Sequence, residues 1–333
     1  MSGVCKPDAQ DRCSEVGIMP EIDMTPTITN IYKLYGGLQK NRPHLGASII
    51  GDKCARKLWF SFRHVKAKEL DGKLGRLFDT GHREESRLLD ELASIGCEVY
   101  SHVKGKQIHY TDPVNRHISG SLDGIGRGFE EAPETWHVIE IKTANGNNFD
   151  KLEKSGVKKA KPEHYAQMQV YMHWAGLNRA YYFAVCKNDD RIYGERVEYS
   201  KKDAESLLGR ARIIVDDPNV PERFGGASES YPPCSWCDYR ELCYGRDIAD
   251  VNCRTCCHST PKADGSWYCE KKQTECDLCW SHTFIPALVP LEMIGVDETS
   301  ESIVYSTKSG EHITNGDGGL QGDVFRSKVK VVL

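Results

Sequence analysis

The sequence predicts an α/β core with a central mixed sheet flanked by helices, plus a small cysteine-rich module. An acidic amphipathic helix is followed by several stretches whose hydrophobic period is close to two, and then by a helix, a strand and another helix. Nine of the 14 cysteines fall between Cys234 and Cys279. A chain of 333 residues is long enough for one sizeable core and an appended module.

The spacing of apolar residues predicts each element. Residues 1–25 have no periodicity and predict a tail, and a short helix is expected near 26–38. Residues 79–95 have the pattern of an amphipathic helix, whose apolar stripe consists of Leu88, Leu89, Leu92 and Ile95. Strands are predicted at 97–103, 107–110, 118–125, 136–143, 180–187 and 191–199, and further helices at 163–175 and 201–216.

Composition divides the chain into four parts. We expect a tail and helix at 1–44, the α/β core at 45–246, the cysteine-rich module at 247–290 and a β-rich extension at 291–333. The stretch 218–233 is rich in Gly, Pro and Ser and is typical of a linker.

Net charge excludes one class of nucleic-acid protein. At −4 the chain is not a globally basic coat protein, so any contact with nucleic acid must come from local Lys and Arg patches. Residues 1–18 contain no apolar run resembling a signal peptide, and the apolar stretch at 285–296 is interrupted by Pro286, Pro290 and Glu292. We therefore expect a cytoplasmic protein without a membrane partner.

Two neighbouring predicted strands carry a candidate catalytic group. Asp123 ends one strand, and Glu140 and Lys142 lie in the next. Side chains alternate along a strand, so Glu140 and Lys142 point to one face, and a hairpin-like connection would bring Asp123 alongside. Two carboxylates can bind Mg²⁺ or Mn²⁺, and a lysine can stabilise charge on a phosphate. The group suits metal-dependent phosphodiester hydrolysis.

The alternative is an exposed ion pair on a half-polar strand. Taken alone, E-x-K is common by chance. However, Val138, Ile139 and Ile141 make this strand apolar, and a Glu and a Lys are costly to bury unless they are used.

Two helical pairs fit the same chemistry. His82 and Glu85 are three residues apart on one helical face, where an imidazole can join a carboxylate as a metal ligand. Gln167 and Tyr171 are four apart on the helix that follows the Glu/Lys strand, and such a pair can bind phosphate. Each pair also occurs on ordinary helix surfaces.

These motifs resemble the RecB-type branch of the PD-(D/E)xK nucleases. The chain has GH at 81–82, GSLDG at 120–124, EIK at 140–142 and Q-x-x-x-Y at 167–171, in the order of that branch. The resemblance implies a restriction-endonuclease-like core. It implies His82, Asp123 and Glu140 as metal ligands, Lys142 as catalytic lysine, and Gln167 and Tyr171 as substrate-contacting residues. The Gly to His spacing of the first motif departs from the branch, so Glu85 is expected to share the role of His82.

Fourteen cysteines in a cytoplasmic protein indicate metal ligation, because disulfides do not persist in a reducing compartment. Cys54 upstream and Cys234, Cys237 and Cys243 downstream resemble the iron–sulfur subgroup of the RecB branch, which implies a [4Fe–4S] cluster that clamps the core shut. Basic residues beside Cys54 would then line the path of the DNA: Arg56, Lys57 and Arg63.

Other partitions of the cysteines remain open. Cys234, Cys237, Cys253 and Cys256 have zinc-ribbon spacing, and Cys54 would then be a buried free thiol. The later cysteines are similar to a C-terminal module of phage-encoded nucleases. That similarity implies zinc on Cys253, Cys256, Cys269 and Cys279. The surplus candidate ligands are Cys257, Cys276, His258 and His282.

Taken together, the motifs predict a Mg²⁺- or Mn²⁺-dependent deoxyribonuclease. The resemblance implies a phage-encoded exonuclease that acts on single-stranded DNA or DNA ends in recombination, repair or replication, in association with a recombination or replication protein. One alternative is a catalytically idle DNA-binding scaffold, which the intact Asp123, Glu140 and Lys142 argue against. Another is a sequence- or structure-specific endonuclease, although no separate recognition domain is evident.

Overall fold

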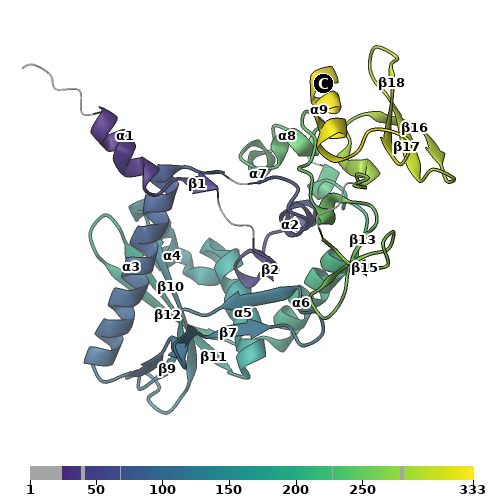
Figure 1. The fold of residues 1–333 in the computed structure, drawn as a ribbon. Coiled ribbons are helices and arrows are strands. Elements are labelled where there is room, and N and C mark those ends of the chain that lie inside the picture. The colour runs from purple at the N-terminus through teal and green to yellow at the C-terminus, as the bar shows by residue number, and fades with distance from the viewer. Residues whose placement is uncertain (1–24, 39–41, 68, 227, 278–280) are drawn as a thin grey trace, which may run out of the picture.

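The computed structural model describes residues 25–333 except 39–41, 68, 227 and 278–280 (Figure 1). The expected tail lies almost wholly outside these residues. The helices are α1 (Thr25–Lys33), α2 (Ala55–Phe62), α3 (Gly72–Ser94), α4 (Gly146–Ala160), α5 (Pro162–Ala175), α6 (Lys201–Asp216), α7 (Pro232–Ser235), α8 (Arg240–Cys243) and α9 (Gly322–Val332). The 3₁₀ turns used below are η1 (Ala47–Ile49) and η3 (Cys253–Thr255).

The strands of the first 200 residues are β1 (Gly37–Leu38), β2 (Leu45–Gly46), β3 (Glu69–Leu70), β4 (Glu98–Tyr100), β5 (His102–Val103), β6 (Lys106–Gln107), β7 (His109–Thr111), β8 (Ile118–Ser121), β9 (Gly124–Arg127), β10 (His137–Ala144), β11 (Arg179–Cys186) and β12 (Ile192–Glu198). The later strands are β13 (Ser259–Pro261), β14 (Trp267–Cys269), β15 (Thr274–Glu275), β16 (Glu292–Asp297), β17 (Ser302–Ser306) and β18 (His312–Gly316).

A five-stranded mixed sheet forms the centre, in the order β12-β11-β10-β9-β4. β10 and β11 are parallel, while the other neighbours are antiparallel. A parallel pair needs a crossover, and α4 and α5 supply it. The prediction of an α/β fold with a mixed sheet is therefore confirmed.

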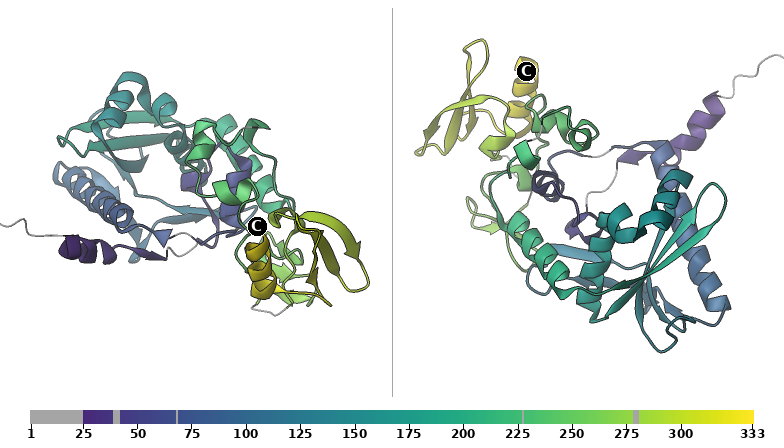
Figure 2. Two further views of the ribbon diagram at one scale, coloured as in Figure 1. Left: turned by 90° about the horizontal axis from the view of Figure 1, so that it is seen from above. Right: turned by 180° about the vertical axis from the view of Figure 1, so that it is seen from behind.

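The two faces of β10 bury different partners. Ile139 and Ile141 pack with Leu88 and Leu92 of α3 on one face. The opposite face belongs to the larger core, which includes residues of α4, α5 and α6. Figure 1 shows α3 running beside the sheet, and the two further views show α4 to α6 on the other side (Figure 2). Because both faces are covered, His137 and Glu140 on β10 are buried, whereas Lys142 and Thr143 near its end are partly exposed.

A second, three-stranded sheet has the order β2-β8-β7 and lies next to α5. In it the short β2 runs parallel to β8, and η1 follows β2 directly. The segment before α2 thereby becomes a wall of the molecule close to residues 118–123.

The acidic helix is longer than the sequence predicts. It begins at Gly72 because Gly72 and Gly75 lie against the main chain of Tyr32 and Tyr35, where a side chain would clash. The expected apolar stripe is confirmed at Leu88 and Leu92, which pack against β10. It is wrong at Ile95, which ends the helix and is 77% exposed.

Helix α4 was not predicted from the sequence. Its first turn, Gly146-Asn147-Asn148, has low helix propensity, yet Asn145 caps it by accepting the N–H of Asn148. Tertiary packing decides the element, since Phe149 and Leu152 are buried in the core. By contrast, the predicted bounds of 201–216 coincide with α6, and those of 163–175 differ from α5 by one residue.

The C-terminal third consists of two small sheets and a helix, drawn in light green to yellow in Figure 1. β13, β14 and β15 form one sheet within the cysteine-rich region, and β16, β17 and β18 form the other. The expected β-rich extension also contains α9, whose Phe325 packs against Phe284 and Tyr305. None of the helices in the described ranges has the length and apolarity needed to cross a bilayer.

A fully buried carboxylate joins the second sheet to α6. Asp112 is 0% exposed and accepts two hydrogen bonds from Arg212, at 2.7 and 3.0 Å. It also accepts the N–H of Asn115 at 2.9 Å and the indole N–H of Trp174 at 3.4 Å. Although burial favours the neutral acid, these donors hold the pKa of Asp112 below its usual value of 3.8.

We predict that Asp112→Ala destabilises the fold by about 3–5 kcal/mol, because it leaves Arg212 without its carboxylate in a half-buried position. The contribution of Asp112 should be complete at neutral pH, since its pKa is lower in the folded than in the unfolded chain. It should be lost only as the pH falls below about 4. Urea unfolding at pH 7 and pH 3.5 measures both effects.

The matched control is Asp150→Ala, which removes an exposed carboxylate that pairs with Arg191 at 3.0 Å. It should cost no more than about 1 kcal/mol at either pH. Equal losses for the two variants would show that the Asp112 network does not stabilise the core.

Candidate active site

The pairing of β9 with β10 brings two carboxylates together. Gly124 is opposite Ile139, so Asp123 stands next to Glu140. The Asp123 carboxylate accepts the backbone N–H of Ile141 at 2.8 Å, which fixes it against β10. The sequence predicted this juxtaposition from a hairpin-like connection, and the antiparallel register is its physical cause.

Glu140 lies at the bottom of the site and is 0% exposed. Within the described residues its carboxylate is paired with Lys142 and has no other hydrogen-bond partner. Burial raises the pKa of Glu140 to about 8, against the opposing effect of the Lys142 charge. The Lys142 charge therefore offsets only part of the cost of burying the Glu140 carboxylate, and a bound cation would stabilise its ionised form further.

Lys142 lies on the same face of β10, as strand alternation predicts. Its ammonium group also lies 3.5 Å from Asp123 and donates to the carbonyl of Ile141 at 3.0 Å. Although burial favours the neutral amine, Asp123 and Glu140 hold the pKa of Lys142 above its usual range. The lysine is a fixed cation beside two carboxylates.

A cavity of about 440 Å³ opens above this group. Its lining includes six residues that the sequence singled out, namely His82, Glu85, Asp123, Lys142, Gln167 and Tyr171. Four separate elements contribute them: α3, the β8–β9 connection, β10 and α5. Tertiary structure thus brings the four sequence motifs to one place.

Glu85 adds a third carboxylate to the site. Burial raises its pKa, and the charge of Asp123 raises it further, while Lys142 and His82 act in the opposite direction. Three acidic groups therefore act on one lysine. The site has an excess of negative charge that a bound cation would neutralise.

Tyr171 and Gln167 of α5 lie at the wall of the cavity next to β8. The Tyr171 hydroxyl donates to the carbonyl of Ser121 at 2.7 Å, and Gln167 contacts the same hydroxyl. Gly120 has to be glycine, because a Cβ there would lie 2.7 Å from the Tyr171 oxygen. Within this arrangement Tyr171 holds the strand that leads into Asp123.

Sequence reasoning missed four further residues of the lining, Arg42, His44, Ser48 and Gln107. Arg42 donates to the hydroxyl of Ser48 at 3.1 Å, across the mouth of the cavity. The available signal was a basic residue and a hydroxyl flanking the buried Leu45-Gly46 strand, a pattern that is too short to stand out. We refer to residues 42–48 as the rim segment.

The rim segment is held from behind by the C-terminal part of the chain. Arg254 donates to the carbonyl of Pro43 at 2.9 Å and to that of Phe62 at 2.8 Å. The ring nitrogen Nε2 of His64 lies 2.8 Å from the carbonyl of Arg42. The position of Arg42 therefore depends on residues more than 200 positions away in the sequence.

The donor set fits a divalent cation, although the side chains are not yet gathered around one point. The Glu140 carboxylate, paired only with Lys142 among the described residues, and the charge imbalance of the site favour hard-cation binding. Within residues 25–333, apart from the gaps, no three His, Cys, Asp or Glu side chains already stand in a metal-binding arrangement. Residues that would hold a cation are Glu140 and Asp123, with Glu85 and His82 at the side.

Comparison with known families agrees with this geometry. Residues 44–244 match the PD-(D/E)XK nuclease superfamily. The chain belongs to the PD-(D/E)XK nuclease superfamily. Members of this superfamily use divalent metal ions such as Mg²⁺ or Mn²⁺, in keeping with the acidic site of the present nuclease.

Two solved structures illustrate the wider similarity. The alkaline exonuclease LHK-Exo from Laribacter hongkongensis is 19% identical, with a TM-score of 0.40 over 52% of this chain and 87% of its own. The same exonuclease in complex with dAMP is 18% identical, with a TM-score of 0.39 over 52% and 86%. At this level of similarity neither structure assigns a substrate to the present nuclease. Among curated proteins, none matches the chain.

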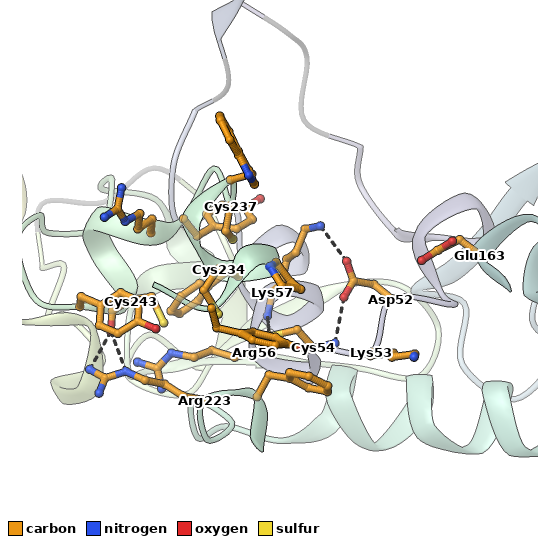
Figure 3. A pocket seen from close by; sticks show the side chains of 18 of the residues that line it. Asp52, Lys53, Cys54, Arg56, Lys57, Glu163, Arg223, Cys234, Cys237 and Cys243 are labelled. Atoms are coloured by element: carbon orange, nitrogen blue, oxygen red, sulfur yellow. Dashed lines mark hydrogen bonds and ion pairs between the residues drawn. The ribbon is translucent and has the colours of Figure 1, made fainter. Parts of the chain in front are cut away.

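The cysteines of the predicted iron–sulfur cluster lie around a separate cavity of about 490 Å³ (Figure 3). Cys54, Cys234, Cys237 and Cys243 all line it. The sulfur of Cys54 accepts the N–H of Lys57 at 3.4 Å, at the N-terminus of α2, where negative charge is stabilised. Segments almost 200 residues apart are thus brought to one pocket.

The remaining cysteines occupy a different cavity. Cys253, Cys256, Cys269 and Cys276 line it, whereas Cys279 lies outside the described residues. The zinc-ribbon partition would need residues from both cavities. Because the two cavities are separate, the structure does not favour the zinc-ribbon partition.

The expectation that Arg63 lines the path of the DNA is wrong. Arg63 is 1% exposed, and its guanidinium lies over the rings of Trp59 and Trp267 at 5.1 Å. Hydrogen bonds to main-chain carbonyls replace water around it. Arg56 and Lys57, by contrast, line the cysteine cavity of Figure 3.

We predict that Glu140→Ala and Lys142→Ala each lower the rate of DNA cleavage by about a thousandfold or more, because each removes a charge from the acidic site. Gel assays with labelled DNA measure the rate, and circular dichroism checks the fold.

The matched control is Glu98→Ala in the same sheet, whose carboxylate pairs with Arg127 at 2.7 Å away from the cavity. It should retain near-parental activity. Near-parental activity of either site variant would disprove the assignment of the active site.

Proposed function

We propose that this nuclease is a Mg²⁺- or Mn²⁺-dependent deoxyribonuclease that degrades single-stranded DNA or DNA from its ends. The observation that carries the proposal is the buried Glu140 beside Asp123 and Lys142, which both line one cavity. A bound divalent cation supplies charge neutralisation on the phosphate and lowers the pKa of an attacking water.

The residues of the chain have distinct parts in this proposal. Asp123 and Glu140 hold the cation, with His82 and Glu85 beside them, and Lys142 stabilises charge that develops on the phosphate. Gln167 contacts the substrate from α5, and Tyr171 keeps the Asp123 strand in place through Ser121. Arg42 supplies positive charge at the mouth of the cavity, where a phosphate backbone would approach.

A role in phage recombination, repair or replication is part of the same proposal. It rests on the motif resemblance, as does association with a recombination or replication protein. The rivals are an endonuclease and a catalytically idle DNA-binding scaffold. An idle scaffold would have no need for one buried and two partly buried acidic groups around one lysine, because such an arrangement destabilises the fold.

We also propose that Cys54, Cys234, Cys237 and Cys243 hold a [4Fe–4S] cluster, and that the later cysteines bind zinc. Four thiols on one cavity match the ligand set of such a cluster. A cluster there would tie α2 to the segment after α6 and close the core.

We predict that the protein degrades end-labelled linear single-stranded DNA in Mg²⁺ or Mn²⁺, and that circular single strands resist it. A requirement for a free end gives this difference. Addition of a chelator should stop the reaction, because the acidic site needs a cation. Equally fast loss of circular DNA would identify an endonuclease. No cleavage of any substrate with either metal would favour the idle scaffold.

A separate prediction concerns the iron content of the protein. Anaerobically purified protein should be brown and carry about four irons per chain. Cys54→Ser should remove the colour and lower the thermal midpoint, since it removes one thiolate. The matched control is Cys97→Ser, a buried thiol outside this cavity, which should keep its iron. Colourless parental protein would refute the cluster.

A further inference from the structure

The cysteine-rich module encloses a cavity of about 50 Å³, apart from the catalytic site. Cys253 and Cys256 line it from the turn at η3, Cys269 from the end of β14, and Cys276 from just beyond β15. His282, which follows these cysteines in the sequence, also lines it. A volume of this size suits one ion or a water molecule rather than an organic ligand.

Cys276 contacts two other residues of this part of the chain. Its sulfur is 3.1 Å from the hydroxyl of Ser259 and also contacts the thiol of Cys253. Cys256 and Cys269 are close enough to influence it electrostatically. Cys269 lines the same cavity and acts on Cys276 through its charge, whereas Cys276 also contacts Cys253 directly.

The hydrogen bonds of His282 determine which of its nitrogens carries the proton. Nε2 lies 3.1 Å from the carbonyl of Asn252 and 3.2 Å from the hydroxyl of Thr255. That hydroxyl donates its own hydrogen to the carbonyl of Asp250 or Asn252, at 2.8 and 2.9 Å. Nε2 therefore faces only acceptors and has to be the N–H nitrogen.

The other nitrogen of His282 is then a bare lone pair. The ring is 4% exposed, so a neutral imidazole is favoured, and Nδ1 has no hydrogen-bond partner. Burial of an unpaired acceptor costs free energy unless something binds it. A histidine whose second N–H donates to a main-chain carbonyl is the usual arrangement of a metal ligand, because that bond fixes both the tautomer and the ring.

The neighbouring candidates fit less well. Cys257 does not line the cavity. His258 does, and its Nε2 is likewise buried without a hydrogen-bond partner in the described residues, but its ring also lies near the carboxylates of Glu301 and Asp317, which a protonated His258 can pair with. Cys276 and His282 therefore fit the role of metal ligands better than Cys269 does.

We propose that Cys253, Cys256, Cys276 and His282 form a zinc site, with His282 bound through Nδ1. Three thiolates and one imidazole are a common donor set for structural zinc. The side chains have to turn toward the cavity on binding, since the described residues contain no ready-made cluster of three. The module has few large aliphatic groups of its own, so metal binding would supply much of its folding free energy.

The site has a consequence for the rest of the molecule. Arg254 lies between Cys253 and Cys256 in sequence, and its guanidinium holds the carbonyls of Pro43 and Phe62. An ion that fixes both cysteines fixes Arg254 and thereby the rim segment. This consequence, unlike the metal site itself, rests on the proposed nuclease function.

The test measures zinc and iron separately in purified full-length protein by mass spectrometry. The parent should hold about one zinc per chain. Cys276→Ser and His282→Ala should each lose at least nine-tenths of it. Cys269→Ser and His258→Ala are the matched controls from the same cavity and should keep it. Loss of zinc from Cys269→Ser with retention in His282→Ala would overturn the ligand set.

A rescue variant separates ligation from folding. His282→Cys should retain zinc, because a fourth thiolate can replace the imidazole. After substitution with Co²⁺, the thiolate-to-cobalt absorption should be stronger in His282→Cys than in the parent, since four sulfurs replace three. Identical spectra, or a parent without zinc that does not take up Co²⁺, would refute the site.

The link to the rim is measured in the same variants. Arg254→Ala and His282→Ala should raise KM for DNA by about threefold or more, while kcat stays within about tenfold of the parent. An unchanged KM in zinc-free but folded protein would refute the link. If no variant, including the parent, cleaves DNA, the metal measurements still decide the zinc site.

Discussion

The structure depends on one costly arrangement, a fully buried glutamate in the central strand of the core. Glu140 is enclosed because helices cover both faces of the sheet, and among the described residues its ionic partner is Lys142 on the same face. A buried carboxylate is costly even when it is paired with a lysine, so the surrounding fold has to be stable enough to keep it. The antiparallel pairing that delivers Asp123, the buried stripe of α3 and the hydroxyl of Tyr171 all serve to hold this group in position.

Long-range contacts form the mouth of the site. The rim segment contributes Arg42 and Ser48 but contains little that would hold it in place by itself. Arg254 and His64 hold it from behind, and Arg63 is buried between two tryptophans in the same region. The cysteine-rich region therefore supports the catalytic half of the molecule. The connection consists of side chains, such as Arg254, that form hydrogen bonds with main-chain carbonyls rather than with carboxylates.

Much of the fold could be predicted from the sequence where local pattern and tertiary environment agree. The bounds of α6 and the alternation along β10 follow directly from periodicity, because one face of each is buried. Prediction failed where packing overrides propensity. Helix α4 forms on an Asn-rich start since its apolar residues reach the core, and Ile95 is exposed because the helix ends there. The start of α3 depends on close contact between Gly72 and the chain at Tyr32.

The sequence by itself determined the residue types of the catalytic group and their shared face, since strand alternation and helical spacing are local properties. It also determined that the cysteines include Cys54, early in the chain, and a later cluster between Cys234 and Cys279. Tertiary structure alone decided that Cys54 joins the cavity of Cys234, that Cys276 contacts Cys253 in the second cavity, and that Arg42 lines the same cavity as Asp123. Contacts between residues far apart in the chain depend on how the elements pack, and spacing within a segment carries no information about that packing.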